Sequence, residues 1–299
     1  MGWRVVYIQE CEYLSCLLDN LKVNTSEDHH LLIPLKDIHS LIIDNVKLVL
    51  SVQLINKCAE NNVNLITCGS DHNPNSITIP HNGHHQMALE IRKQIEWANE
   101  DKLVAHQQII KQKISNQISI LEHCGIKPCI NISKLHQYIE EVQPGDVANR
   151  EGLAAKVYFR LLFGDEFLRF NEDVLNAGLN YGYAIVRSQI NKVVVSKGLN
   201  SSIGVIHKGP SNMFNLSDDI IEPYRPLVDL WVYNHLRFAS EFTREHRKML
   251  VESTTGKIWM GNQKQTIFNA IVLSVDSLIN FFEHTGELAF PSLEKVDDL

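Results

Sequence analysis

The stretch DKLVAHQQIIKQKISNQISILEHCG, residues 101–125, marks the point where the chain adopts a helical periodicity. Its apolar residues recur every three or four positions, with one gap at Gln107, and they are Leu103, Ile110, Ile114, Ile118 and Leu121. This spacing puts them on one face of a helix, and Gly125 then supplies a C-terminal stop. The stretch therefore predicts a long amphipathic helix.

The chain before this helix has a different pattern. Its apolar runs are short and rich in β-branched residues, and Asn, Asp, Gly and Ser separate them: WRVVYI, HLLIPL, SLIID, VNLIT and SITIP. Such runs predict strands. One helix is expected at 51–61, and residues 69–85 are expected to form a linker that contains the last strand.

After residue 85 the helical period continues to the end of the chain. Further helices are predicted at about 133–142, 147–163, 172–197, 226–249 and 262–283, with glycine or proline at the breaks. Strands followed by helices predict the α+β class. We expect a small, β-sandwich-like N-terminal domain at 1–80 and a larger all-α domain at 81–299.

Composition excludes several classes of protein. The chain has 299 residues, 44% hydrophobic and 21% charged, and it contains no apolar run long enough for a membrane span. We therefore expect a cytoplasmic globular protein of about two domains. The net charge of −7 argues against a protein that coats nucleic acid, so any DNA binding must be local. A group of lysines after Asp101 is interpreted residue by residue as solvated helix surface: Lys102, Lys111, Lys113, Lys127 and Lys134.

The segment GDVANREGLAAKVYFRLLFG, residues 145–164, predicts a helix with an acid on its inner face. Asp146 is expected to be the N-cap. The helix would align Glu151 with three core positions, Ala155, Tyr158 and Leu162. A carboxylate on such a stripe is costly unless it is paired or binds a metal. The sequence leaves both open: an ion pair with Arg150, Lys156 or a distant arginine, or a metal.

The next predicted helix has Gly178 and Gly182 four residues apart in its interior. Each glycine costs about 1 kcal/mol relative to alanine in a helix. We expect a neighbouring helix to approach closely there, the favoured neighbour being the helix that carries Ala154 and Ala155.

The segment GVIHKGPSNMFNLSDDIIEPYRPLVD, residues 204–229, gathers one histidine and several acids. Two glycines bracket His207, which predicts a turn. Ser217 is expected to cap a short helix from Asp218, and Pro223 then predicts a kink at Glu222. The acids are explained either by the dipole of a helix N-terminus or by a divalent cation that imidazole and carboxylate bind together.

These two segments, with PHNGHHQMALEIRKQ, KISNQ and FLRFNEDVLNAGLNYGYAIVRS, closely resemble the CRISPR-associated integrase that acquires spacers, in its type II version. The resemblance runs from the β domain to about residue 250. It implies a β domain followed by a helical domain, a homodimer, and a complex with a small companion subunit that holds double-stranded DNA. Other type II CRISPR proteins are further possible partners.

The resemblance also implies the site. The Glu of the NREG block is Glu151, the His of the GVIH block is His207, and the acid before the proline is Glu222. These three would be the catalytic residues and the ligands of Mg²⁺ or Mn²⁺. Asp218 and Asp219 are neighbouring competitors for the third role.

The expected DNA contacts are basic residues close to these blocks: Lys156, Arg160, Arg187, Lys208 and Arg225.

Three functions are compatible with the sequence. The first is a metal-dependent DNA integrase and endonuclease that inserts spacers into a CRISPR repeat array by attack of a 3′-hydroxyl on a phosphodiester, as part of antiviral defence. The second is a metal-dependent DNA nuclease of a repair or mobile-element pathway. The third is a non-catalytic assembly platform. The product distinguishes the first two, since only an integrase joins strands.

Overall fold

The computed structural model describes residues 2, 4–24, 30–80 and 83–295. The chain forms two compact units, Met1–His85 and Gln86–Leu299. The sequence had suggested a boundary at 80/81. The class is α+β, as predicted, with the strand-rich unit first and the helical unit second.

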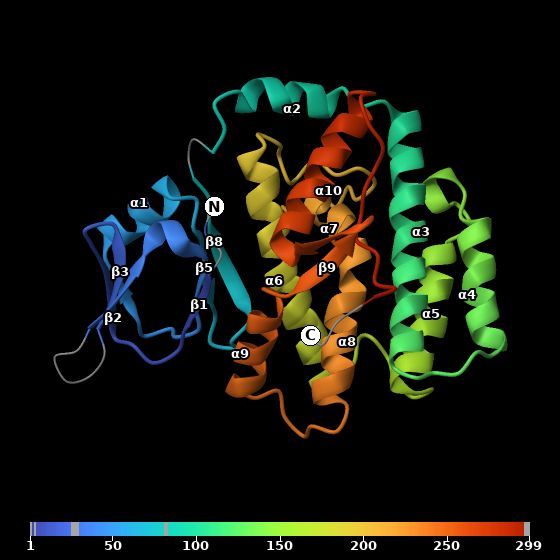
Figure 1. Ribbon diagram of the computed structural model, residues 1–299, viewed down its shortest axis with the longest axis horizontal. Coiled ribbons are helices and arrows are strands. Elements are labelled where there is room, and N and C mark those ends of the chain that lie inside the picture. Colours follow the sequence, from blue (N-terminus) through green and yellow to red (C-terminus); the bar gives the residue numbers. More distant parts are fainter. Residues whose placement is uncertain (1, 3, 25–29, 81–82, 296–299) are drawn as a thin grey trace. The chain divides into compact units, whose positions relative to one another are not determined.

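The first unit contains two four-stranded sheets (Figure 1). One has the order β1(Arg4–Ile8), β5(Ile38–Ile43), β7(Asn64–Cys68), β8(Pro74–Thr78), parallel except for the β7–β8 pair. The other has the order β4(His30–Pro34), β3(Asn20–Asn24), β2(Tyr13–Leu17), β6(Val49–Leu50). Strand β8 is the last strand expected within 69–85.

Both sheets of this unit share one core. Leu14 and Leu21 from the second sheet pack in the same cluster as Leu41 and Leu65 from the first. Strand β5, with the sequence IHSLII, is buried along its whole length, as expected for an inner strand of a sheet. Helix α1(Val52–Glu60) adds Leu54 to this core, and the short helix η1(Leu35–Asp37) joins β4 to β5.

The second unit is built from helices and one hairpin. Its elements are α2(Met87–Ile95), α3(Asn99–His123), α4(Ile130–Glu141), η2(Pro144–Asp146), α5(Arg150–Phe163), α6(Val174–Ser196), α7(Asn215–Ile221), η3(Glu222–Tyr224), α8(Arg225–Leu236), α9(Arg244–Ser253), β9(Lys257–Met260), β10(Gln263–Thr266) and α10(Ile267–Phe282). In Figure 1 the long helix α3 runs beside α4 and α5. No helix in the described residues combines the length and the apolar composition that crossing a membrane requires.

The prediction of an all-α second domain is wrong at its C-terminal end. Strands β9 and β10 pair as an antiparallel hairpin, and Gly261 turns between them with φ of 55°. The helix expected at 226–249 is two helices, because a new helix start interrupts it: Thr243 and His246 form a capping box at the beginning of α9. The helix expected from 262 begins at Ile267, since the preceding residues belong to β10.

Gly178 and Gly182 let α6 and α8 pack in close contact. A Cβ at Gly178 would overlap Leu236, and one at Gly182 would overlap Val228. Both obstacles belong to α8. The close neighbour is therefore α8 and not α5, which corrects the prediction; sequence spacing shows that a helix approaches but does not identify it.

Candidate active site

Helix α3 brings a buried cation to the centre of the second unit. The Lys113 side chain is only 10% exposed, and its Nζ lies 2.5 Å from Glu151 Oε1 and 2.5 Å from Glu222 Oε2. The interpretation of Lys113 as solvated surface is thus wrong. Burial disfavours the charged ammonium, but the negative charges of Glu222 and Glu151 outweigh burial and raise the pKa of Lys113.

Glu151 is fixed by the way α5 begins. The N-cap is Asn149, in the left-handed region at φ 50°, and its side chain accepts a hydrogen bond from the Gly152 N–H. Asp146 is therefore not the N-cap as predicted. Its carboxylate nevertheless accepts the N–H groups of Arg150 and Glu151, at 2.8 and 2.9 Å. These contacts order the first turn and direct the half-buried Glu151 toward α3. Its partner is Lys113, and not Arg150, Lys156 or a distant arginine as the sequence suggested.

Glu222 lies at the predicted kink, where α7 passes into η3. Its side chain is 6% exposed, and Oε1 accepts a hydrogen bond from Arg225 Nε at 2.9 Å. Oε2 lies near the Lys113 ammonium but accepts no well-directed hydrogen bond from the described residues. Burial raises the pKa of Glu222, but the charges of Arg225 and Lys113 overcome it and lower the pKa to about 2. Glu222 is therefore ionised.

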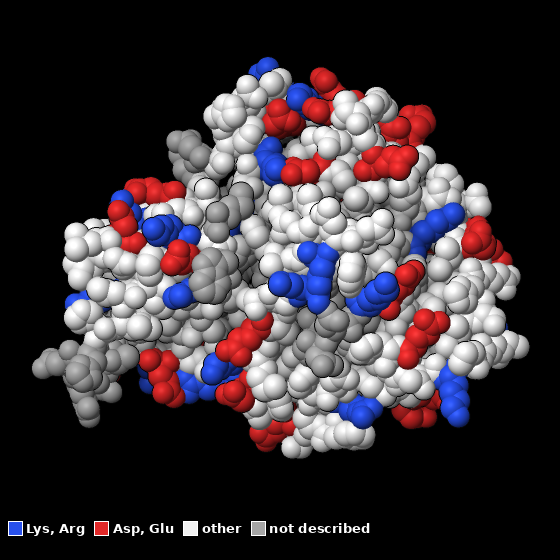
Figure 2. Space-filling view, viewed as in Figure 1, with Lys and Arg blue, Asp and Glu red and all other residues white. Residues whose placement is uncertain are grey.

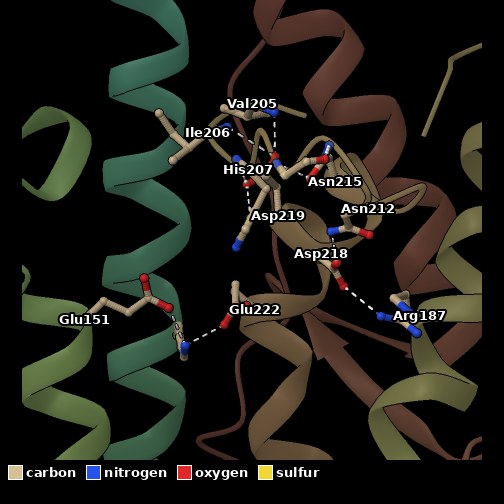
Figure 3. A network of polar contacts seen from close by, with 12 residues as sticks. Glu151, Arg187, Val205, Ile206, His207, Asn212, Asn215, Asp218, Asp219 and Glu222 are labelled. Carbon is tan, nitrogen blue, oxygen red and sulfur yellow. Dashed lines mark hydrogen bonds and ion pairs between the residues drawn. The ribbon is translucent and has the colours of Figure 1, made fainter. Parts of the chain in front are cut away.

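Asp219 holds the loop that carries His207 (Figure 3). Its buried carboxylate accepts the N–H groups of Val205, Ile206 and His207, at 2.5, 3.3 and 3.2 Å. It also bonds His207 Nδ1 at 2.7 Å. Gly204 makes room for this arrangement, since a Cβ there would lie 2.7 Å from Asp219 Oδ2. Helix α7 starts at Asn215 rather than at Asp218, so Asp219 lies inside the helix and is rigidly placed.

The His207 ring is oriented by this contact and remains accessible, with 45% of the side chain exposed. The hydrogen bond that His207 makes to the Asp219 carboxylate, and after it the charges of Asp219, Glu222 and Asp218, raise the pKa of His207 against the opposing effect of burial. With Nδ1 engaged, Nε2 is the nitrogen left for a ligand.

Asp218 points elsewhere. Its carboxylate accepts a hydrogen bond from Asn212 Nδ2 at 2.8 Å and pairs with Arg187 at 3.5 Å (Figure 3). The Arg187 guanidinium also covers the Phe214 ring, 4.7 Å from its centroid. Asp218 and Asp219, adjacent in sequence, thus serve different contacts, because successive helix positions face directions about 100° apart.

The basic residues expected to contact DNA fall into two groups. Lys156, Arg160 and Lys208 are exposed. Arg187 and Arg225 are engaged by Asp218 and Glu222. The face of the molecule in Figure 2 carries acidic and basic side chains intermixed, without a broad basic field, in keeping with the net charge of −7.

Asn116 connects α3 to the kink. It is 1% exposed, and its Nδ2 donates to the carbonyls of Pro223, at 2.8 Å, and Pro291, at 3.0 Å. Its Oδ1 accepts the N–H of Leu293 at 3.2 Å. This residue of the KISNQ block therefore fixes α3 beside the residue that follows Glu222.

His106 lies two turns before Lys113 on α3, and it was not identified from the sequence as a candidate site residue. It is 8% exposed, and its Nδ1 has no hydrogen-bond partner among the described residues. Burial lowers the pKa of His106, while the charges of Glu151 and Asp219 act against this. The seven-residue interval to Lys113 was a usable signal, since it puts both side chains on one helix face.

The three residues predicted as metal ligands take part in two separate contacts. Glu151 and Glu222 meet at Lys113, and His207 meets Asp219. Within the described ranges, no three His, Cys, Asp or Glu side chains converge closely enough to hold a metal ion. The ligand set therefore stays a prediction.

Comparisons with known proteins identify the family of the chain. The family model of CRISPR associated protein Cas1 matches residues 6–262. The CRISPR-associated endonuclease Cas1 of Neisseria meningitidis serogroup C is 31% identical over 286 residues, covering 95% of this chain and 92% of that protein.

Solved structures share the fold. A casposase bound to integration product superposes with a TM-score of 0.77 at 17% identity, covering 100% of this chain and 96% of the other. A chain of a Cas6-RT-Cas1–Cas2 complex gives 0.73 at 16% identity, covering 95% of this chain and 35% of the other. From the match to the family model over most of its length and the likeness to the Neisseria protein, the chain belongs to the Cas1 family of CRISPR-associated proteins.

Proposed function

We propose that this protein is a metal-dependent DNA integrase and endonuclease that inserts short DNA segments into a CRISPR repeat array. The observation that carries the proposal is that Glu151, from α5, and Glu222, from η3, both contact the Lys113 ammonium. The His207 ring is oriented by its contact with Asp219. The names of the similar proteins, an endonuclease and a casposase bound to integration product, support this reaction class.

The donor chemistry fits a hard divalent cation. Glu151 and Glu222 offer carboxylate oxygens and His207 offers Nε2, a set that suits Mg²⁺ or Mn²⁺. Glu222 Oε2 has no well-directed hydrogen-bond partner within the described part of the chain and faces the Lys113 ammonium at 2.5 Å, so this buried oxygen already faces a cation. A bound divalent cation would supply Lewis acidity to the phosphoryl group and activate the attacking oxygen.

The protein's own groups then have distinct tasks. Asp219 fixes the His207 ring through Nδ1 and orders the loop through three N–H groups. Arg225 holds Glu222 in its ionised form. The site needs no covalent protein nucleophile, because the DNA 3′-hydroxyl attacks the phosphodiester and the strand oxygen leaves.

Phosphate contacts are proposed at the exposed rim beside His207. Lys208 is exposed and directly follows His207 in the chain, so its ammonium group is proposed to pair with a DNA phosphate. Lys156, Arg160, Arg187 and Arg225 remain further proposed contacts.

The assembly is proposed to be a homodimer that binds a small companion subunit and double-stranded DNA. The shared fold with a chain of a Cas6-RT-Cas1–Cas2 complex supports the companion subunit. The assay should therefore contain purified protein, companion subunit, a short duplex with free 3′-ends and a repeat-bearing target.

The decisive measurement is strand joining by Glu151→Gln, His207→Ala and Glu222→Gln. Each is expected to lower the rate by on the order of 100-fold or more, with thermal unfolding showing a folded protein. Glu283→Gln, which removes a surface partner of Lys93, is the control and should keep the wild-type rate. Full activity in the first three variants would refute the site. Cleavage without joining would favour the alternative function, a metal-dependent DNA nuclease.

A further inference from the structure

Among the ion pairs of the described residues, Lys113 is the one residue that contacts both proposed carboxylate ligands. It donates a hydrogen bond to Glu151 Oε1 and lies at the same distance from Glu222 Oε2. The two carboxylates come from segments 71 positions apart in sequence, and this ammonium joins them. In Figure 3 Glu151 and Glu222 extend toward the same point from opposite sides.

The local charge is balanced by this contact. Glu151 and Glu222 carry two negative charges, and Lys113 and Arg225 carry two positive ones. A buried ion pair is stable only when each charge is compensated. A divalent cation at the same two carboxylates would leave this cluster with an excess of positive charge if the ammonium stayed in place. The ammonium and the cation are therefore electrostatic competitors.

The Lys113 ammonium can leave the two carboxylates by a movement of its side chain, while the backbone of α3 stays in place. Three residues further along α3, Asn116 anchors the helix to the carbonyls of Pro223 and Pro291. The backbone of α3 is thus tied to the segment that carries Glu222. The Lys113 side chain has four rotatable carbon–carbon bonds, so its ammonium can swing away while the helix stays.

We propose that the Lys113 ammonium occupies the place between Glu151 and Glu222 in the metal-free protein and yields it to the divalent cation, so that ammonium and cation compete for the same two carboxylates. The inference rests on the proposed metal site and adds how that site is held and loaded. A purely structural salt bridge has the opposite signature, because its loss would loosen the two acids and weaken cation binding.

The test measures Mn²⁺ binding to the full-length protein by electron paramagnetic resonance of free Mn²⁺, together with thermal unfolding with and without Mn²⁺. Lys113→Met keeps the length of the side chain and removes its charge. We expect Lys113→Met to bind Mn²⁺ about ten-fold or more tightly than wild type, as loss of a cation within a few ångströms implies. Its Tm without metal should fall, and Mn²⁺ should raise it by more than in wild type.

Two further variants control the result. Lys111→Met removes the same charge from the same helix two positions away, and it should bind Mn²⁺ as wild type does. Lys113→Arg keeps the positive charge and should restore wild-type affinity. If Lys113→Met does not fold, Lys113→Gln takes its place, since its amide can still donate to one carboxylate.

The outcomes separate the inference from the proposed function. If wild type binds Mn²⁺ and Lys113→Met binds it equally well or more weakly, the competition is overturned and the metal site still stands. Absence of Mn²⁺ binding in wild type and in every Lys113 variant, with strand joining unaffected by Glu151→Gln, overturns the metal site and the competition with it.

Discussion

Gly204 leaves room for the carboxylate that orients His207. A Cβ at this position would lie 2.5 Å from the His207 carbonyl oxygen and 2.7 Å from Asp219 Oδ2, and neither atom can retreat without breaking the loop. Gly204→Ala should therefore displace His207 and lower the free energy of unfolding by about 1–3 kcal/mol. Strand joining should fall at least about ten-fold. Denaturant unfolding and the joining assay measure both effects.

Gly209→Ala is the matched control. It lies on the other side of His207, and its Cβ would approach nothing closer than Asn212 Cβ at 3.2 Å. It should change stability by less than about 1 kcal/mol. Equal behaviour of the two alanine variants would mean that the space around Gly204 is not what orients His207.

Asp229 predicts a dependence of stability on pH. It is 1% exposed and accepts a hydrogen bond from the Tyr183 hydroxyl. Burial, opposed mainly by the hydrogen bond from Tyr183, raises the pKa of Asp229 to about 6 from 3.8. Between pH 4 and 6 the folded protein keeps a proton that the unfolded chain has lost. The Asp229 contribution to the free energy of unfolding thus falls as pH rises, by about 3 kcal/mol in total.

Asp229→Asn isolates this contribution. The amide oxygen can still accept from Tyr183 but does not titrate. The free energy of unfolding of the variant, minus that of wild type, should grow between pH 4 and pH 6 and level off above it. Urea unfolding at several pH values measures the difference, and a flat difference would contradict the raised pKa.

At the scale of elements, the contact between α6 and α8 depends on a missing side chain. Alanine favours a helix over glycine by about 1 kcal/mol, so Gly182→Ala would stabilise α6 if the position were open. The Cβ would instead overlap Val228, whose branched side chain has little rotamer freedom. We expect Gly182→Ala to lower the free energy of unfolding by about 1–3 kcal/mol.

The double variant Gly182→Ala/Val228→Ala tests the cause. Removing the Val228 methyl groups opens space for the new Cβ, so the two changes should cost less together than the sum of the separate costs, by more than about 0.5 kcal/mol. Strictly additive values from denaturant unfolding would show that the overlap does not determine the loss.

The limits of sequence-based prediction appear most clearly at this scale. Periodicity located α3 and α6, because both have long apolar faces. It did not reveal the break between α8 and α9, where a capping box starts a new helix. At the site, family blocks gave Glu151, His207 and Glu222. The KISNQ block contains Lys113 but assigned it no role, because only the packing of α3 against α5 and η3 shows that this lysine points inward.

The proposed function requires this protein to bind DNA through few positively charged side chains. With a net charge of −7, contact must be confined to a small number of cations near the site. Each phosphate neutralised contributes about −0.9 to the slope of log K against log salt concentration. For three to five contacts we expect a slope of about −3 to −5.

Lys208→Gln should reduce the magnitude of this slope by about 1. Lys248→Gln, an exposed lysine on α9, is the comparison and should leave the slope unchanged. Fluorescence anisotropy across a salt series measures both. A wild-type slope steeper than about −8 would require a broad basic surface instead.

Helix α3 carries Lys113 and Asn116 in one continuous run of turns, each aimed at a different neighbour. Adding or removing a single residue between His106 and Lys113 would turn the upstream part of the helix by about 100° relative to the rest. Such a change in length would separate His106 from the face it shares with Lys113. The tolerance of this chain to insertions and deletions should accordingly be lowest in its longest helix and higher in the exposed loops, which a scan of single-residue insertions would map.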